Sequence, residues 1–160
     1  MNNLTCCFTG HRPQKIFENE QAIIFSLEKA IVEAVSNGYT TFITGMAYGV
    51  DIWAAEIVLR LKRKHNLKLI CAVPHPNFEK RWSLEWQERY NKIVSSADEV
   101  HCISNYYSKG CYQIRNIWMV DHSSLVIAAY NGTIGGTKNT IVYAKQKNKK
   151  VVNVLDYPLS

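Results

Sequence analysis

Three short stretches of this chain combine glycine with polar or charged side chains, and each directly follows a run that is typical of a buried strand. They span residues 9–13, 44–51 and 131–137. In an open α/β sheet, ligands bind outside the carboxyl ends of the strands. Glycine there lets backbone N–H groups approach an anion, and a following helix N-terminus adds positive potential. One such stretch alone would indicate a tight turn, but three predict a shared crevice for a phosphate-bearing ligand.

The second stretch offers the most complete anion site. Gly45 and Gly49 flank a turn that leads into a predicted helix. Because glycine lacks a Cβ, we expect the N–H groups of Met46 and Ala47 to face a phosphate. Asp51 lies in the first turn of the helix. It either accepts ribose hydroxyls or favours the helix N-terminus through its charge.

The first stretch places a cation at the end of the first strand. The guanidinium of Arg12 suits a bidentate contact to phosphate or carboxylate, and the alternative is a salt bridge to Asp51 or Asp121 that holds the loops. His11 either donates to a phosphate or is a hydrogen-bonded structural residue, and we assign it no catalytic role. Tyr48 either stacks on a base or ribose or is an ordinary aromatic beside a turn.

Strand-like and helix-like segments alternate along the whole chain, which predicts an α/β fold with a mostly parallel, twisted sheet of about six strands and helices on both faces. The expected strands are residues 4–8, 40–44, 67–73, 99–103, 124–130 and 151–155. The expected helices are residues 19–37, 50–65, 78–97, 110–121 and 137–147. In the first of these helices, apolar residues recur at helical spacing at positions Ile24, Leu27, Ile31 and Ala34.

Length and hydropathy predict one domain over residues 1–160, with 47% hydrophobic residues to form its core. No apolar run approaches the about 20 residues that span a membrane, and the N-terminus lacks the pattern of a signal peptide. We therefore expect a cytoplasmic protein with no membrane partner. The net charge of +6 is consistent with an anionic partner. Two basic patches, residues 60–64 and 145–150, lie at helix ends, where cations complement the helix dipole.

The five cysteines predict no metal site, because they show no C-x-x-C or Cys/His ligand spacing. Cys6, Cys7, Cys71 and Cys102 lie in strand-like runs, where we expect small buried hydrophobes. Cys111, near a helix start, is interpreted as a structural or incidental thiol.

Two common nucleotide motifs are absent from the sequence. Gly10 is followed by His11-Arg12-Pro13 rather than by a G-x-G-x-x-G pattern, and no G-x-x-x-x-G-K-[ST] run occurs. An ordinary NAD dehydrogenase or P-loop NTPase is therefore disfavoured. Further along the chain, Arg81 and Trp82 are weaker candidates for the rim of the crevice. Trp82, Trp86 and Tyr90 repeat every four residues, which is more typical of a core or an oligomer face than of a base-stacking platform.

Four elements together resemble the YpsA-like branch of the SLOG superfamily, which joins the DNA-processing protein DprA with the Lonely Guy phosphoribohydrolases. They are Thr9-Gly10-His11-Arg12-Pro13, Gly45 to Asp51, Arg115-Asn116 with Met119-Val120-Asp121, and Gly135-Gly136-Thr137. The resemblance covers residues 5 to about 155. It implies a Rossmann-like fold whose glycine loops bind nucleotides or nucleotide-derived ligands, and it implies that dimers or higher homo-oligomers are common.

The resemblance also implies a substrate contact for Arg115, which with Met119 matches the R-x-x-x-M element of the phosphoribohydrolases, although Asn116 stands where those enzymes usually have Lys. Combined with the three loops, it predicts the following ligand-binding residues: Thr9, Gly10, His11, Arg12, Gly45, Met46, Ala47, Tyr48, Gly49, Asp51, Arg115, Asn116, Met119, Gly135, Gly136 and Thr137.

The third glycine loop departs from the enzymes in this superfamily. Their motif reads P-G-G-x-G-T-x-x-E, and its Glu is thought to be essential for cleaving the N-glycosidic bond. Here Gly136-Thr137 is followed by Lys138-Asn139-Thr140, so no carboxylate stands at those positions. We therefore assign no catalytic residue, metal or resident cofactor. Asp51 or Asp121 would have to substitute for the Glu in an enzyme of this kind.

The leading hypothesis is a protein that senses or sequesters a nucleotide-derived, ADP-ribose-like small molecule. The first alternative is a nucleotide phosphoribohydrolase or N-glycosidase. The others are DprA-like binding of single-stranded DNA, which we rank lower, and an interaction role in cell division.

Overall fold

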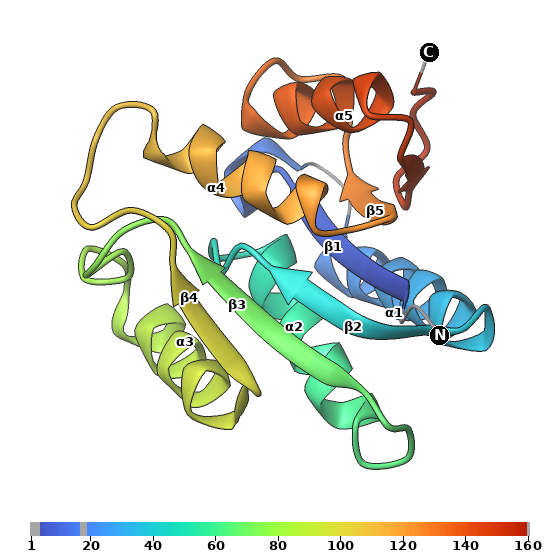
Figure 1. The fold of residues 1–160 in the computed structure, drawn as a ribbon, viewed down its shortest axis with the longest axis horizontal. Coiled ribbons are helices and arrows are strands. Elements are labelled where there is room, and N and C mark those ends of the chain that lie inside the picture. Colours follow the sequence, from blue (N-terminus) through green and yellow to red (C-terminus); the bar gives the residue numbers. More distant parts are fainter. Residues whose placement is uncertain (1–3, 17–18, 160) are drawn as a thin grey trace.

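The computed structural model describes residues 4–16 and 19–159. Six parallel strands form one sheet in the order β4-β3-β2-β1-β5-β6 (Figure 1). The strands are β1 (Leu4–Gly10), β2 (Tyr39–Thr44), β3 (Lys68–Val73), β4 (Glu99–Cys102), β5 (Leu125–Ala129) and β6 (Lys150–Asn153). The helices are α1 (Glu20–Ser36), α2 (Val50–Leu61), α3 (Leu84–Ser96), α4 (Cys111–Asp121) and α5 (Gly136–Gln146), with a 3₁₀ turn, η1, at Pro13–Lys15.

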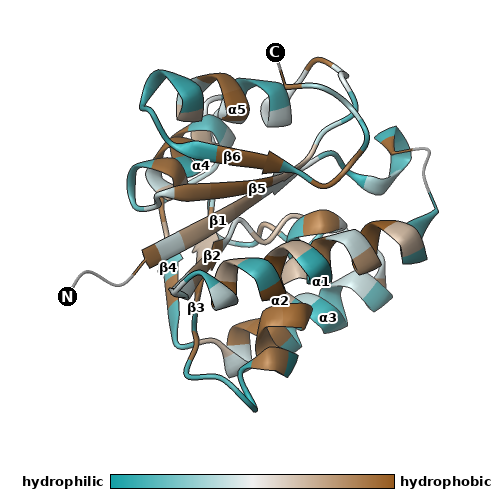
Figure 2. Cartoon of the chain, turned by 90° about the vertical axis from the view of Figure 1, so that its right-hand side faces the viewer, coloured by the Kyte–Doolittle hydropathy of each residue, from teal (hydrophilic) through white to brown (hydrophobic). Residues whose placement is uncertain are grey.

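The helices cover both faces of the sheet. Helices α1, α2 and α3 lie on one face, and α4 and α5 lie on the other (Figure 2). The central strand β5 is buried along its whole length, as expected for a parallel strand that is covered on both sides. The larger apolar core lies under α1 to α3, with Phe8, Phe42 and Leu69 from three strands fully buried in it. The predicted α/β, Rossmann-like architecture is confirmed.

The strand order brings together the three glycine loops. β1 lies between β2 and β5, so the loops that follow these three strands emerge side by side at one edge of the sheet. The register is level at this edge, since Gly10 is paired with Ala129 at the ends of β1 and β5. Strands β2, β3 and β4 follow on one side of β1, and β5 and β6 lie on its other side, so the direction in which strands are added reverses at β1. Ligands of open α/β sheets bind at such a reversal of strand order.

The third helix is shorter than predicted. It begins at Leu84 rather than near residue 78, and the Ser83 side chain caps it by accepting a hydrogen bond from the Trp86 N–H (3.5 Å). The residues before it form turns, in which Asn77 has a positive φ of 62°. The apolar spacing that begins at Trp82 therefore starts outside the helix, because turn residues contribute to the same buried face.

One expectation about burial was wrong. Cys102 is exposed, because β4 is an edge strand with no neighbour on one side. On α1, Ile24 packs at the margin of the core, and its neighbour Ile23 is buried beside Leu27. The other four cysteines are buried. No helix in the described part of the chain is long and apolar enough to cross a membrane.

Candidate functional site

A cavity of about 390 Å³ lies where the three loops meet, and we call it the inner cavity. Ten of the predicted site residues line it: Thr9, Gly10, His11, Arg12, Ala47, Asp51, Arg115, Asn116, Gly136 and Thr137. They come from the ends of β1 and β2 and from the N-terminal parts of α2, α4 and α5. The loops converge because their strands are neighbours, and α4 adds Arg115 from the opposite layer of the fold.

Arg115 is the best-anchored side chain of the inner cavity. It is 6% exposed, its Nε donates to the Asn116 Oδ1 at 2.8 Å, and its Nη1 donates to the Gly45 carbonyl oxygen. Burial lowers the pKa of this guanidinium, and the neighbouring Asp51 partly opposes that change. Because two of its donors are already committed, the orientation of the guanidinium is fixed before any ligand binds.

Asp51 is the acidic residue that lines this cavity, and it is 6% exposed. Burial raises the pKa of its carboxyl to about 6, while Arg115 and the hydrogen bond from the Ala47 N–H oppose the rise. Its Oδ1 is buried and has no hydrogen-bond partner among the described residues. Its Oδ2 accepts from the Ala47 N–H at 3.2 Å, so the carboxyl also holds the loop that precedes α2.

The surroundings of Gly45 explain why the second loop requires glycine at this position. A Cβ at this position would lie 2.9 Å from both the Arg115 Nη1 and the Asp51 Oδ2. Such contacts are closer than carbon can approach without displacing a neighbour. The glycine therefore makes room for two charged side chains rather than directly for a ligand.

The expectation that two loop amides face a phosphate was wrong for this conformation. The Met46 N–H donates to the Thr44 Oγ1 at 3.3 Å, and the Ala47 N–H donates to Asp51. Met46 adopts a left-handed conformation (φ 65°), and its side chain is fully buried. The loop satisfies its own donors, so side chains supply the positive charge of the site.

His11 also lines the inner cavity and is 4% exposed. Its ring packs against Tyr130 with centroids 5.6 Å apart. Burial lowers the pKa of the imidazole, and the Lys15 cation lowers it further. Its Nε2 is buried without a hydrogen-bond partner among the described residues, so the ring has an unused polar atom beside the cavity.

Arg12 stands at the mouth of the inner cavity. Its guanidinium lies over the ring of Tyr48, with Cζ 4.5 Å from the centroid, and the Gln14 Nε2 donates to the Tyr48 hydroxyl at 2.8 Å. No salt bridge joins Arg12 to Asp51 or Asp121 in the described structure. Asp121 is instead exposed and accepts from the Tyr143 hydroxyl at 2.6 Å. The predicted alternative, in which a salt bridge from Arg12 to one of these two carboxylates holds the loops, was therefore wrong.

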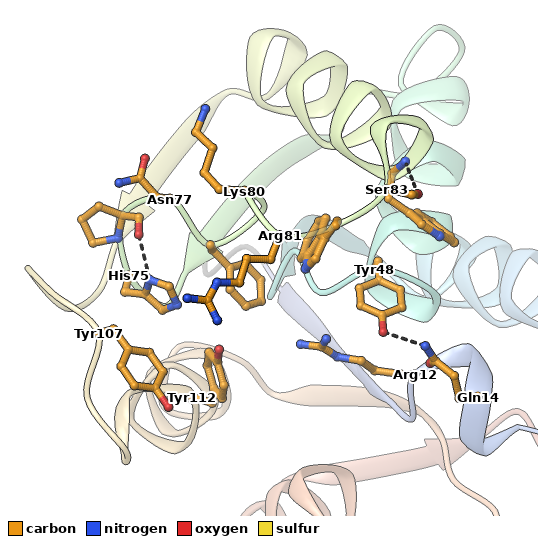
Figure 3. Close-up of a pocket in the computed structure, with 14 residues that line it drawn as sticks. Arg12, Gln14, Tyr48, His75, Asn77, Lys80, Arg81, Ser83, Tyr107 and Tyr112 are labelled. Atoms are coloured by element: carbon orange, nitrogen blue, oxygen red, sulfur yellow. Dashed lines mark hydrogen bonds between the residues drawn. The ribbon is translucent and has the colours of Figure 1, made fainter.

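A second cavity of about 1020 Å³, which we call the outer cavity, opens beside the first (Figure 3). Tyr48, Trp82 and Trp86 line it, and the ring centroids of Tyr48 and Trp82 are 5.3 Å apart. The stripe of aromatics was expected to form core or an oligomer face. Tyr90 is indeed buried, but Trp82 and Trp86 are half-buried and form a wall of this cavity.

Four other predicted site residues lie near the inner cavity without lining it. Gly49 (φ 97°) permits close contact with Pro13, since a Cβ there would be 2.7 Å from the proline Cδ. Gly135 precedes α5 with a φ of 153°. Met119 is 1% exposed and packs in the core under α4, so its side chain does not reach the cavity. Met46 is buried likewise.

Several residues that line the two cavities were missed by the sequence reasoning. Gln14 and Lys15 follow the first loop, and Tyr112 precedes Arg115 by one helical turn. His75 and Tyr107 come from the loops after β3 and β4. The available signal was their position, since all of them follow strand ends or begin a helix at the same edge of the sheet.

Comparisons with known proteins agree with this architecture. Among solved structures, DprA from Streptococcus pneumoniae superposes with a TM-score of 0.69 at 18% identity, over 96% of this chain and 52% of that one. DprA from Helicobacter pylori gives 0.63 at 19% identity, over 92% and 63%. The molybdenum cofactor binding protein from Rippkaea orientalis gives 0.59 at 20% identity, over 94% and 76%. This chain thus spans about half of the first of these proteins.

The fold and the crevice of glycine loops define a Rossmann-like α/β protein of the SLOG type. The family model described as the YspA SLOG family (YpsA) matches residues 6–159, and the chain belongs to that family. It is 35% identical to the SPbeta prophage-derived protein YoqJ of Bacillus subtilis over 118 residues, which are 66% of this chain and 69% of YoqJ. It is 31% identical to a UPF0398 protein of Macrococcus caseolyticus over 131 residues, which are 77% and 72% of the two chains.

Proposed function

We propose that this protein binds a nucleotide-derived, phosphate-bearing small molecule of the ADP-ribose type in the inner cavity. The observation that carries the proposal is the buried guanidinium of Arg115, fixed by Gly45 and Asn116 at the wall of a cavity built from three strand-end loops. A pre-oriented, desolvated guanidinium is suited to a charge-assisted contact with phosphate.

The charges around the inner cavity support an anionic ligand. Arg12, Lys15 and Arg115 line it, and among the described lining residues Asp51 supplies the one carboxyl. Because the pKa of Asp51 is raised to about 6 by burial, part of its negative charge is lost in mildly acidic solution. A phosphate that enters the cavity therefore meets a net positive field.

Sensing or sequestration is favoured over turnover. In the third loop, Lys138 and Asn139 are exposed, and the Thr140 hydroxyl donates back to the Gly136 carbonyl at 2.8 Å. The position at which the phosphoribohydrolases carry a carboxylate is thus occupied by Thr140, whose hydroxyl makes a hydrogen bond within α5. Asp51 faces the cavity, but one of its oxygens is engaged by a backbone N–H and the other is buried. A hydrolase would need a carboxylate with access to the sugar.

Binding of single-stranded DNA is the second candidate. DprA from Helicobacter pylori has a single-stranded DNA binding mode, and the outer cavity here combines aromatic and cationic side chains. One observation argues against DNA binding. The basic patch at the end of α2 is partly neutralised, because Arg60 pairs with Glu28 and Lys62 pairs with Asp98.

Native mass spectrometry of freshly purified protein tests the proposal first. We expect a bound compound that is released on denaturation and has the mass of a nucleotide derivative. Isothermal titration calorimetry with ADP-ribose then quantifies binding. Arg115→Ala should weaken the affinity at least about tenfold, since it removes a charged hydrogen-bond donor from a buried site. Arg63→Ala, which removes an exposed cation after α2, serves as the control.

Three results would contradict the proposal. Unchanged ADP-ribose affinity in Arg115→Ala would remove the residue on which it rests. Release of free base from nucleoside monophosphates by the purified protein would place the phosphoribohydrolase first. Tight, strongly salt-dependent binding of an oligo(dT) strand, with no binding of ADP-ribose, would place the DNA-binding candidate first.

A further inference from the structure

We infer that the outer cavity is a nucleobase subsite, so that the ligand is a nucleoside diphosphate derivative that spans both cavities. This inference rests on the proposed function, because it uses the inner cavity as the site of the ligand's distal sugar-phosphate end. It adds the position of the base, the number of phosphates and the residues that select them.

The two cavities adjoin each other. Arg12, Gln14 and Tyr112 line both of them, so these three side chains stand at the boundary between the inner and the outer cavity. In Figure 3, the guanidinium of Arg12 points from the β1 loop into the outer cavity. A molecule whose end lies beside Arg115 and that extends past Arg12 therefore enters the outer cavity.

Aromatic rings form two walls of the outer cavity. Tyr48 stands on one side (Figure 3), and the ring of Trp82 packs against it with centroids 5.3 Å apart. On the other side His75 is edge-to-face with Tyr107, with centroids 5.3 Å apart and planes at 85°, and Tyr112 lies 5.9 Å from His75 (Figure 3). Tyr107 is 61% exposed, so much of its ring is free to contact a ligand. Stacking on such rings tolerates any base, because every base has a π-face.

The outer cavity is also cationic. Arg12, Lys80 and Arg81 line it, and no Asp or Glu occurs among the described residues of its lining. The Arg81 side chain points into the cavity from the turn before α3, toward His75 and Tyr112 (Figure 3). None of the salt bridges in the described chain involves Arg81. Two guanidinium groups that face one cavity without a carboxylate fit the charge of a pyrophosphate.

The shape of the combined site favours a small molecule over a nucleic-acid strand. The inner cavity ends at Arg115 and Asp51, both buried, so it accepts the end of a ligand and not a chain that passes through. Sites for small molecules typically have volumes of roughly 300–1,000 Å³. The outer cavity, at about 1020 Å³, has room for a nucleoside and its attached phosphate, while the second phosphate and the distal sugar occupy the inner cavity.

Calorimetry with two probes tests the inference. ADP-ribose would fill both cavities, whereas ribose 5-phosphate would occupy the inner one alone. We expect Tyr107→Ala and Arg81→Ala each to weaken ADP-ribose binding about tenfold and to change ribose 5-phosphate binding less than about twofold. Tyr106→Ala, at a neighbouring side chain that is 74% exposed and does not line either cavity, and Arg63→Ala are the matched controls.

Arg115→Ala separates this inference from the proposed function. If it abolishes binding of both probes while Tyr107→Ala and Arg81→Ala leave ADP-ribose affinity unchanged, the inner site stands and the base subsite is refuted. If the wild-type protein binds neither probe, the proposed function fails and the inference fails with it. If the two outer variants lose affinity for oligo(dT) but not for ADP-ribose, the outer cavity serves a strand, which also overturns the inference.

Discussion

Asp51 and Arg115 lie against the same face of Gly45, one from the first turn of α2 and one from α4 on the opposite side of the sheet. This arrangement links the second loop to α4, because Arg115 donates to the Gly45 carbonyl while Asp51 accepts from Ala47 two residues later. Gly45, Asp51 and Arg115 therefore determine both the conformation of the second loop and the charge of the inner cavity.

Gly45→Ala should disturb both stability and binding. The new Cβ would lie 2.9 Å from the Arg115 Nη1 and from the Asp51 Oδ2, so at least one of them must move. We expect a loss of about 1–3 kcal/mol in the free energy of unfolding in urea, and at least about tenfold weaker ADP-ribose binding. Gly110→Ala is the control, since a Cβ there meets no atom within 4 Å. Equal behaviour of the two variants would contradict the packing argument.

The raised pKa of Asp51 predicts a specific pH dependence of stability. Its pKa is about 6 in the folded state against an ordinary 3.8, so the folded state binds more protons between these values. Stability should therefore fall as pH rises from about 4 to about 6 and level off above, by up to about 3 kcal/mol from this group.

Asp51→Asn isolates this contribution. The difference in free energy of unfolding between wild type and variant, measured in urea from pH 4 to pH 7, should change across the window and be constant above it. Asp98 and Glu99, whose pKa values are lowered, act in the opposite sense, but they cancel in the difference. A difference that does not vary with pH would show that Asp51 titrates normally.

Tyr48 should support Arg12 through its ring rather than its hydroxyl. The guanidinium lies 4.5 Å from the ring centroid, and the hydroxyl accepts from Gln14. Tyr48→Ala removes the platform and should weaken ADP-ribose binding about tenfold, within the range of desolvated cation–π contacts. Tyr48→Phe keeps the ring and should remain within about twofold of wild type. Similar losses in both variants would assign the effect to the hydroxyl instead.

Thiol reactivity tests the placement of the edge strand. Cys102 is exposed, and the other four cysteines are buried. A disulfide reagent at pH 8 should therefore modify one of the five thiols of the native protein and all five after unfolding. The reaction should be slow, because partial burial raises the pKa of the Cys102 thiol. Native Cys102→Ser should show no modification over the period in which the wild-type protein loses one thiol, and modification of two or more thiols in that period would contradict the buried positions.

Local patterns in the sequence were sufficient for the fold. Apolar runs predicted the six strands, and apolar residues at helical spacing predicted most of the helices. Two predictions from local patterns were wrong: Cys102 was expected to be buried but is exposed, and the helix expected over residues 78–97 begins at Leu84. A run of apolar residues does not reveal whether a strand lies at the edge of a sheet or whether a buried face begins in a turn.

The sequence by itself determined which loops carry glycine and charge, and hence that the ends of the strands form the candidate site. Only the tertiary structure decided that β1 lies between β2 and β5, that Arg115 reaches Gly45 across the sheet, and that Met119 points into the core. It also placed His75 and Tyr107 in the lining of the outer cavity, from the loops after β3 and β4, which no sequence motif marks. The physical reason is that turn chemistry and periodicity are local, whereas strand order and close approach of charges depend on packing between residues far apart in the chain.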